Sequence, residues 1–417
     1  MSNSIIVVGA GPIGLLSAFE LARKGCAVTV LDQSSIGSGG SRWNAGEVVP
    51  LEVDPVSSLQ FLGKGARGLL APRLEPSLTV GLRDLLGDPG FFARFSWHAR
   101  PAAYRRGLEA LVDFARPTFE LLSSYQHSGV ETSVQGTRFL YIFGSEAAAA
   151  TARRDAIERS NTTGLQQPGP VLGRVELHEF EPGLSDKAGA GYFQLGNKYI
   201  DSNAFIDSLI AALRAAGVRF IEHADITRID EADGAVQVHT RERSYVASQA
   251  VIAAGAASGE LAARFGAKLH LRAGRGYSVR ARVPLAHRDT LLHFSESHVV
   301  ASPFDTEVQL AGQMNLAAKP APADLFHTRI LSKAAEFLPA VAESQVTRTG
   351  SGIRPLTPDG LPYIGSLTPR VHVATGHNMI GLTLAPATAA AVADLVLGTQ
   401  AHPNLAPFSP HRFTSGD

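Results

Sequence analysis

A glycine-rich turn between a buried strand and a helix constrains the fold of this chain more than any other feature. Residues 5–8 are four consecutive branched apolar residues, which is typical of a strand inside a parallel sheet. The turn Gly9-Ala10-Gly11-Pro12-Ile13-Gly14 follows at once, and apolar residues then recur at helical spacing. The first glycine permits a tight turn, the second lets a pyrophosphate approach the backbone, and the third lets the helix pack closely on its strand. The pattern predicts a Rossmann-type α/β domain that binds a dinucleotide.

An acidic residue ends the second predicted strand, residues 28–31. Asp32 lies where a carboxylate can accept hydrogen bonds from both ribose hydroxyls of an adenosine and would repel a 2′-phosphate. We therefore expect Asp32, with its neighbour Gln33, to bind the adenosine, and we expect the dinucleotide not to be NADP. An α/β turn that binds nothing is the competing interpretation, and the ordered strand, turn, helix, strand and acid weigh against it.

Length, charge and cysteine content set further limits. A chain of 417 residues exceeds the size at which one hydrophobic core keeps growing, so two domains are expected. Lys+Arg and Asp+Glu are both 38, and no basic block suggests a nucleic-acid partner. The single cysteine, Cys26, allows neither an intrachain disulfide nor a cysteine metal cage, and no other residue spacing predicts a metal site.

The expected location is the cytoplasm, because no secretory signal precedes the first strand and one cysteine fits a reducing compartment. The longest uncharged run, residues 371–393, is broken by histidine, glycine and proline, so no transmembrane segment is expected. Peripheral contact with a membrane and oligomer formation both stay open.

Strand and helix signals recur along the chain in an order that predicts a discontinuous nucleotide domain. Helices are expected over residues 101–128 with a break at Pro117, over 145–160, after Asp201-Ser202, and from about Pro386 to Leu397. Short alternating runs between residues 269 and 314 predict antiparallel strands. We assign residues 1–85, 195–270 and 345–417 to the nucleotide domain, and residues 86–194 and 271–344 to an inserted α+β substrate domain.

An arginine in a proline-flanked segment is the strongest candidate for substrate binding. Arg354 lies in Gly352-Ile353-Arg354-Pro355, and Thr357-Pro358-Asp359-Gly360 follows. Each proline fixes its own φ and biases the preceding residue towards extended conformations, so Arg354 has little freedom. A fixed guanidinium is suited to bidentate binding of a carboxylate, although a structural arginine between strand ends is the simpler alternative.

Five motifs in order resemble one enzyme family. They are the N-terminal glycine turn, Ser41-Arg42-Trp43-Asn44-Ala45-Gly46-Glu47-Val48, Arg275-Gly276-Tyr277-Ser278, the Arg354 segment, and Thr375-Gly376-His377-Asn378. The chain resembles the FAD-dependent amine and amino-acid oxidoreductases that include D-amino-acid oxidase, glycine oxidase, sarcosine oxidase and, closest, bacterial D-amino-acid dehydrogenase. The resemblance implies FAD rather than NAD, bound noncovalently because the cysteine lies in the wrong turn for a covalent link.

The resemblance also implies which residues line the sites. Arg354 would bind the substrate carboxylate, with Tyr277 and His298 as further catalytic candidates; His298 stands near the place where some members have a tyrosine. Residues expected to bind the cofactor share positions in the family's turns: Gly9, Gly11, Pro12, Ile13, Gly14, Asp32, Gln33, Ser41, Arg42, Asn44, Ala45, Gly46, Ala254, Gly255, Gly352, Gly376, His377, Asn378, Met379, Ile380, Gly381 and Leu382.

The function implied is oxidation of the carbon–nitrogen bond of an amino acid to an imine, with hydride transfer to flavin. The resemblance to D-amino-acid dehydrogenase favours a D-amino acid, and the histidine in place of tyrosine favours a cyclic or N-substituted one, such as a D-proline or hydroxyproline type, over D-alanine. Electrons would pass on to dioxygen, a quinone or a partner protein. A non-catalytic or partner-dependent flavin-binding subunit and an NAD-dependent dehydrogenase of the same fold class are the alternatives.

Overall fold

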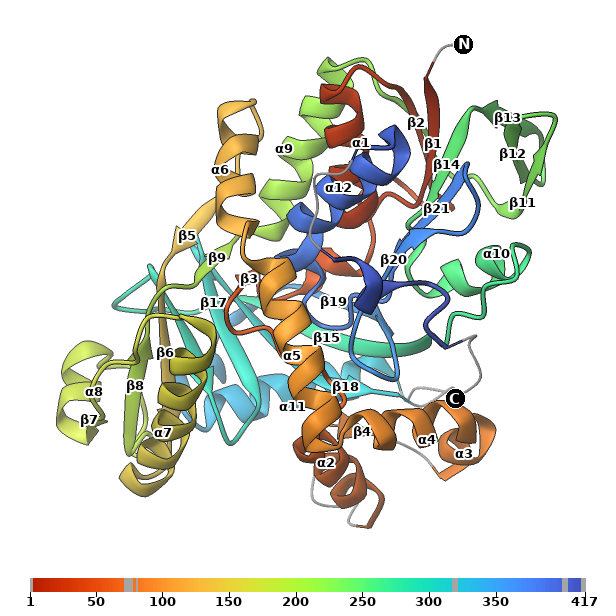
Figure 1. Ribbon diagram of the computed structural model, residues 1–417. Coiled ribbons are helices and arrows are strands. Elements are labelled where there is room, and N and C mark those ends of the chain that lie inside the picture. The colour runs from red at the N-terminus through yellow and green to blue at the C-terminus, as the bar shows by residue number, and fades with distance from the viewer. Residues whose placement is uncertain (1–2, 71–77, 80–81, 317–321, 400–403, 414–417) are drawn as a thin grey trace.

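The computed structural model describes residues 3–70, 78–79, 82–316, 322–399 and 404–413. Its strands form a six-stranded sheet, a nine-stranded sheet and two three-stranded sheets (Figure 1). The expected class, a Rossmann-type α/β unit combined with an α+β unit that contains an antiparallel sheet, is confirmed. Among the described residues, no helix is both long and apolar enough to cross a membrane.

The six-stranded sheet carries the N-terminal strand in its interior. Neighbouring strands from edge to edge are β10 (Arg219–Ile221), β2 (Ala27–Leu31), β1 (Ser4–Val8), β14 (Gln249–Ile252), β21 (Val371–Thr375) and β20 (Tyr363–Ser366). The first five pair in parallel, and β20 is antiparallel to β21. Segments far apart in sequence therefore bring their carboxyl ends to one edge, where ligands of open α/β sheets bind.

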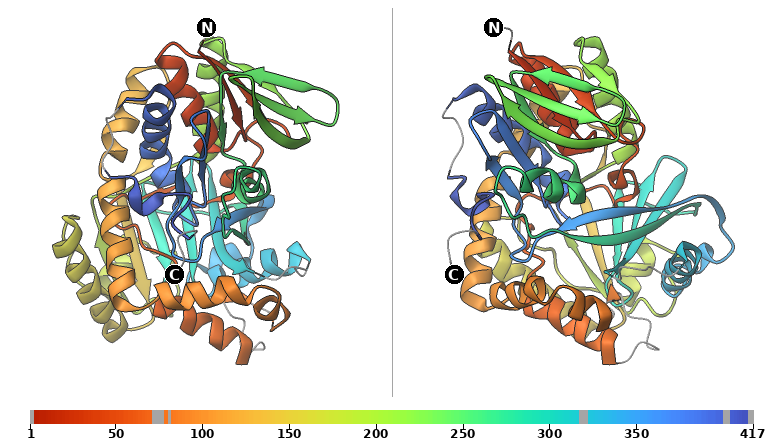
Figure 2. Two further views of the ribbon diagram at one scale, coloured as in Figure 1. Left: turned by 45° about the vertical axis from the view of Figure 1, so that its right-hand side comes forward. Right: turned by 90° about the vertical axis from the view of Figure 1, so that its right-hand side faces the viewer.

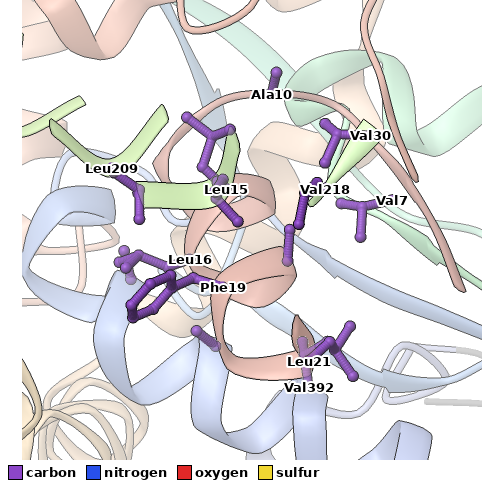
Figure 3. Packing of buried hydrophobic residues seen from close by; sticks show 14 of the residues in the cluster. Val7, Ala10, Leu15, Leu16, Phe19, Leu21, Val30, Leu209, Val218 and Val392 are labelled. Atoms are coloured by element: carbon purple, nitrogen blue, oxygen red, sulfur yellow. The ribbon is translucent and has the colours of Figure 1, made fainter. Parts of the chain in front are cut away.

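Both faces of this sheet are covered, which explains why its first strand is uniformly apolar. Ile5 and Val7 point into a core formed with helices α1 (Pro12–Arg23), α9 (Ser202–Ala215) and α12 (Gly381–Leu397). Figure 3 shows Leu15, Leu16 and Phe19 of α1 packed within this core. Ile6 and Val8 point to the opposite face, towards a three-stranded sheet of β11 (Ile226–Ala232), β12 (Ala235–Thr240) and β13 (Ser244–Ala247).

The nine-stranded sheet is assembled from the middle of the chain and one late strand. Its order is β19 (Gln345–Leu356), β15 (Arg272–Arg282), β18 (Glu307–Asn315), β17 (Val299–Phe304), β16 (Thr290–Phe294), β6 (Arg138–Phe143), β8 (Ala190–Gln194) and β7 (Leu172–Gly173), with β4 (Leu78–Thr79) beside β18. The pairings among β15, β16, β17 and β18 are antiparallel, as the alternating runs predicted, and β19 is antiparallel to β15. Strand β16 pairs with β6, and β18 with β4, in parallel. Figure 2 shows β15 and β19 as a long ribbon across the middle of the molecule.

The two faces of the nine-stranded sheet have different neighbours. Tyr277, Val279 and Ala281 of β15 point into a core with helix α11 (Ala323–Ala335). Arg280, on the opposite face, binds Asp201, which caps the N-terminus of α9. This second face is therefore turned towards the six-stranded sheet, and the loop of residues 41–46 lies where the two meet.

The remaining elements connect or cover these sheets. The second three-stranded sheet consists of β3 (Glu47–Val48), β9 (Lys198–Ile200) and β5 (Val134–Gly136). The other described helices are α2 (Leu59–Leu70), α3 (Leu82–Gly87), α4 (Pro89–His98), α5 (Pro101–Ala115), α6 (Thr118–His127), α7 (Glu146–Thr163), α8 (Arg174–Phe180) and α10 (Ser258–Ala263), with 3-10 turns η1 (Gly40–Trp43), η3 (Gly255–Ala257), η4 (Pro339–Val341) and η5 (Ala406–Phe408).

Most helix boundaries follow the expected signals. Helices α5 and α6 are separated at Pro117, and the side chain of Asp201 accepts hydrogen bonds from the first turn of α9. Helix α12 differs, because it begins at Gly381 and contains Pro386 in its second turn. The two-unit division stays a proposal. We place its last boundary after β19 rather than at residue 345, because β19 pairs with β15 along its whole length.

Candidate cofactor and substrate site

The N-terminal turn at the end of β1 has the shape of a dinucleotide cradle. Gly9 has a φ of +108°, and a Cβ there would lie 2.3 Å from the carbonyl oxygen of Ala253. A Cβ on Gly14 would lie 1.9 Å from the carbonyl oxygen of Gly9, whereas one on Gly11 would meet nothing within 4 Å. Gly11 also precedes α1 without a side-chain cap, so the amides of that helix N-terminus are available to an anion. The open space is therefore where a pyrophosphate would lie.

Asp32 lies at the end of β2, beside this turn. Its carboxylate accepts hydrogen bonds from the backbone amides of Ala10 at 2.7 Å and Ser34 at 2.8 Å. Each carboxylate oxygen has a second lone pair, so ribose hydroxyls can still be bound. Gln33 is exposed next to it. Ala254 and Gly255 follow β14 at the same edge of the sheet, where Thr375 Oγ1 donates to the Gly255 carbonyl at 2.8 Å.

The loop of residues 41–46 joins the two sheets. A Cβ on Gly352 of β19 would lie 2.6 Å from Gly40 Cα, so these backbones touch. Gln309 Nε2 donates to the Asn44 carbonyl, and Ser302 Oγ donates to the Ala45 carbonyl at 2.7 Å, which fixes the loop on the face of the nine-stranded sheet.

The Arg42 side chain of this loop has its partners within the protein. The Arg42 guanidinium binds the Gly37 carbonyl at 2.6 Å, Asn203 at 3.2 Å and Asp207 at 2.5 Å, so it anchors the loop to α9. Any contact from Arg42 to a cofactor would come from its backbone. Ser41 lies in the same 3-10 turn, and Gly46, with a φ of +78°, lies against the carbonyl of Ile200.

The segment from Gly376 to Leu382 also offers backbone rather than side chains. Asn378 is buried with a φ of +52°, and its amide bonds Thr357, Gly360 and Gly376. His377 is buried with Nε2 3.0 Å from Thr388 Oγ1, and burial lowers its pKa to about 3. Leu382 belongs to the core, and Ile380 packs partly buried against a neighbouring cluster, while Met379 is half exposed.

Arg354 lies on β19, on the sheet face that is turned towards the loop of residues 41–46. Its guanidinium lies over Gly276 of β15, where an added Cβ would come within 2.8 Å of it. Among the described residues none forms a hydrogen bond or ion pair with this half-buried cation. Burial lowers the pKa of the Arg354 guanidinium, and the carboxylate of Glu47 acts in the opposite direction. An unpaired guanidinium in such a place is suited to a carboxylate ligand.

The other two catalytic candidates do not join Arg354. Tyr277 is 1 % exposed and points to the opposite face of β15, where its ring stacks on Phe326 at 4.1 Å. Its expected place in the substrate site is therefore wrong, because alternation along β15 turns Gly276 and Tyr277 to opposite faces. His298 is exposed in the turn before β17, with a φ of +51°. Three strand spacings, about 14 Å, separate its strand from β19.

Two further residues lie near this region, His293 on the inner face of the nine-stranded sheet and Glu47 on β3 of the second three-stranded sheet. His293 of β16 has its Nε2 2.9 Å from Glu47 Oε1, and its ring stacks on Tyr141 at 4.3 Å. Glu47 directly follows the loop of residues 41–46. Alternation along β16 and β17 could have indicated which of their residues point towards this loop. Their pairing could not be read from the sequence, because it joins strands of different sheets.

A second carboxylate follows on the same segment but has internal partners. Glu52 accepts a hydrogen bond from Asn197 and lies 3.7 Å from Arg159, which also binds Asp54 at 2.7 Å. Burial raises the pKa of the Glu52 carboxyl. Among the described residues, no group of three or more His, Cys, Asp or Glu side chains could hold a metal ion.

Comparisons with known proteins agree with this geometry. Residues 4–395 match the model of the DAO family, described as FAD dependent oxidoreductase. A D-amino acid dehydrogenase of Cereibacter sphaeroides is 28% identical over 99% of this chain and 96% of its own length, and a glycine oxidase of Geobacillus kaustophilus is 27% identical over 97% and 96%.

Solved structures share the fold over nearly the whole chain. The crystal structure of glycine oxidase from Geobacillus kaustophilus has a TM-score of 0.74 at 22% identity, covering 98% of both chains. That of L-proline dehydrogenase from P. horikoshii has a TM-score of 0.69 at 20% identity, covering 99% of this chain and 97% of that one. The family match extends over both sheets and favours FAD over the NAD alternative. The chain belongs to the DAO family of FAD-dependent oxidoreductases.

Proposed function

We propose that this enzyme oxidises the carbon–nitrogen bond of an amino acid, with Arg354 as the group that binds the substrate carboxylate. The observation that carries the proposal is the unpaired guanidinium over Gly276, on the sheet face turned towards the cofactor loop. A free carboxylate is the ligand that such a group binds in bidentate geometry. The first relatives named above, a D-amino acid dehydrogenase and a glycine oxidase, support an amino acid as the substrate.

The residues that would hold FAD lie at the carboxyl edge of the six-stranded sheet. Gly11 and the N-terminus of α1 would receive the pyrophosphate, and Asp32 the adenosine ribose. Backbone groups of the loops around Gly46 and Gly376, together with the N-terminus of α12, would surround the flavin. Bound FAD supplies the acceptor for the hydride that leaves the substrate carbon.

The protein's own contribution is orientation. Arg354 would fix the carboxylate, so that the carbon–hydrogen bond points at the cofactor in one direction. The proline after Arg354 and the pairing of β19 with β15 hold that side chain's backbone in place. Loss of the amine proton and of the hydride leaves an imine, and water hydrolyses the imine after release.

Within this class we propose a D-amino acid, or a cyclic or N-substituted one of the D-proline or hydroxyproline type. This narrower proposal comes from the sequence, where His298 stands near the place of a common tyrosine; in the structure, His298 lies in an exposed turn away from Arg354. If it is right, His298→Ala changes the ratio of kcat/KM for cyclic and linear substrates by more than about twofold. A smaller change, below the roughly 1 kcal/mol of an ordinary hydrogen bond, removes His298 from specificity.

An anaerobic bleaching screen tests the proposed function. The purified protein is mixed with D- and L-amino acids, N-methylated ones and cyclic ones, and flavin absorbance is recorded. Loss of the oxidised flavin spectrum with at least one amino acid is expected. A yellow protein that no amino acid bleaches would instead support the flavin-binding subunit. Reoxidation by dioxygen or by a quinone, followed in the same cuvette, would separate the possible electron acceptors. Cytoplasmic location and membrane contact stay predictions from the sequence.

A further inference from the structure

The inner face of the nine-stranded sheet carries one charge, and a strand of the second three-stranded sheet carries the opposite one; the two do not form an ion pair. Arg354 on β19 is the positive one, and Glu47 on β3 is the negative one. Their distance exceeds that of an ion pair, about 4 Å, yet the charge of Glu47 still acts on the pKa of Arg354. Their backbones are linked by geometry: Arg354 lies on the strand whose Gly352 touches Gly40, and Glu47 directly follows the loop of residues 41–46.

Glu47 differs from its neighbour Glu52 in a way that leaves it available. Glu52 is fully engaged inside the protein, by Asn197 and Arg159. The Glu47 side chain is 30% exposed, and its one polar contact among the described side chains is His293 Nε2 at 2.9 Å. Among the described residues, no lysine or arginine lies within ion-pair distance of this carboxylate. The carboxylate is therefore held at one end and open at the other.

His293 is held firmly enough to position Glu47. Its side chain is 17% exposed, its ring is almost parallel to that of Tyr141, at 9°, and it lies 5.9 Å from the ring of Phe139. Both aromatic residues belong to β6, which pairs with β16. The imidazole therefore has a fixed plane, and its Nε2 lies 2.9 Å from Glu47 Oε1, although the angles of a hydrogen bond are not formed.

We propose that Glu47, positioned by His293, binds the amino group of the substrate, opposite the carboxylate bound by Arg354. The inference rests on the proposed function and names the chemical group that the second side of the site recognises. An amino acid carries its carboxylate and its ammonium group on one carbon, so its two charges are complementary to those of Arg354 and Glu47. Two charge-assisted contacts fix the orientation of that carbon, which one contact alone would leave free to rotate.

The inference predicts discrimination between an amino acid and the same acid without its nitrogen. The probes are the best substrate of the bleaching screen and its carboxylate analogue, which is propionate for alanine and tetrahydrofuran-2-carboxylate for proline. The Kd of the amino acid is taken from the concentration dependence of flavin reduction. The Kd of the analogue is taken from its perturbation of flavin absorbance.

The variant Glu47→Gln keeps the shape of the side chain and removes its charge. We expect its Kd for the amino acid to rise about tenfold or more, since hydrogen bonds to charged groups are the stronger ones, and its Kd for the analogue to stay within about twofold. Glu242→Gln, which removes an exposed carboxylate from the turn between β12 and β13, should change neither. FAD content and Tm report whether the fold is retained.

Several outcomes would overturn the inference. Equal changes in both Kd values, or no change in either, mean that Glu47 does not recognise nitrogen. If Glu47→Gln fails to retain FAD, Glu47→Asp and His293→Gln replace it, and each must weaken amino-acid binding more than analogue binding. A wild-type protein that no amino acid bleaches refutes the proposed function first. A bleachable wild type with an unselective Glu47→Gln refutes this inference alone.

Discussion

The edge of the six-stranded sheet and the inner face of the nine-stranded sheet differ in the kind of group, backbone or side chain, that they offer to a ligand. At the edge, the groups that we propose to bind the cofactor belong to the backbone. A Cβ added to Gly9 or Gly14 would lie 2.3 or 1.9 Å from a carbonyl oxygen, and helix α1 starts without a side-chain cap. At the face, the groups that we propose to bind substrate are side chains: Arg354 and Glu47 come from two strands and form few polar contacts within the protein. The edge is specified by a local sequence pattern, whereas the face depends on how distant strands pair.

The sharpest test of the edge compares two glycines of the same turn. Gly14→Ala places a Cβ 1.9 Å from the Gly9 carbonyl oxygen, so we expect loss of FAD and destabilisation by more than about 3 kcal/mol, the upper range of overpacking. Gly11→Ala meets no protein atom and should fold normally while binding FAD more weakly. Tm and the FAD-to-protein ratio measure both. A Gly14→Ala protein with wild-type Tm would contradict the close packing.

The corresponding test of the face removes Arg354. Arg354→Ala should keep FAD and lower kcat/KM. The loss should correspond to about 2–5 kcal/mol of transition-state binding free energy, the usual cost of deleting one member of a buried charged pair. Arg354→Lys should also lose activity, because a lysine cannot form the bidentate contact. Arg348→Ala, on an exposed position of the same strand, serves as the control and should stay within about twofold of wild type. Unchanged kcat/KM in Arg354→Ala would exclude the carboxylate role.

A pH titration tests whether His377 stays buried and neutral at the edge of the six-stranded sheet. Burial lowers the pKa of His377 to about 3, below the ordinary value of about 6.5. The unfolded chain therefore binds a proton as pH falls below 6.5 while the native imidazole stays neutral, so stability is lost on acidification. Between pH 7 and 5.5 this amounts to about 1 kcal/mol.

The variant His377→Gln should lose that part of the pH dependence, as measured by urea unfolding at both values. His127→Gln, an exposed histidine at the end of α6, should keep it. Identical pH dependence in wild type and His377→Gln would show that the imidazole is protonated as readily in the folded protein as in the unfolded chain.

The smallest expected effect concerns Tyr277, on the far side of the substrate-facing sheet. Tyr277→Phe removes a hydroxyl that interacts with Asn315 but keeps the ring stacked on Phe326. Stability should fall by no more than about 1 kcal/mol, and kcat/KM should change less than about twofold. A tenfold loss of kcat/KM would mean that the hydroxyl reaches the substrate after all.

Particular residues show how far the sequence predicts this molecule. The first strand, its glycine turn and Asp32 are predictable, because each depends on neighbours within one βαβ unit. Arg354 is predictable as a rigid, unusual arginine, since prolines act locally. The orientation of Tyr277 is not, because it depends on which face of β15 receives α11, and β18 changes register opposite Gly276. The contact of His293 with Glu47 is also set only by tertiary packing.

The backbone contact between Gly40 and Gly352 has a consequence for the evolution of substrate range. It joins the segment that leads into the loop of residues 41–46 to the strand that carries Arg354. The two backbones are so close that an added Cβ on either glycine would lie within 2.7 Å of the Cα atom of the other. On the proposed roles, the distance from cofactor to substrate carboxylate is then a constant of the scaffold, and larger residues at either glycine would alter the chemistry for every substrate at once. New substrates would have to be accommodated at the other end, where the aromatic wall of β6 and β16 can change without moving either binding element.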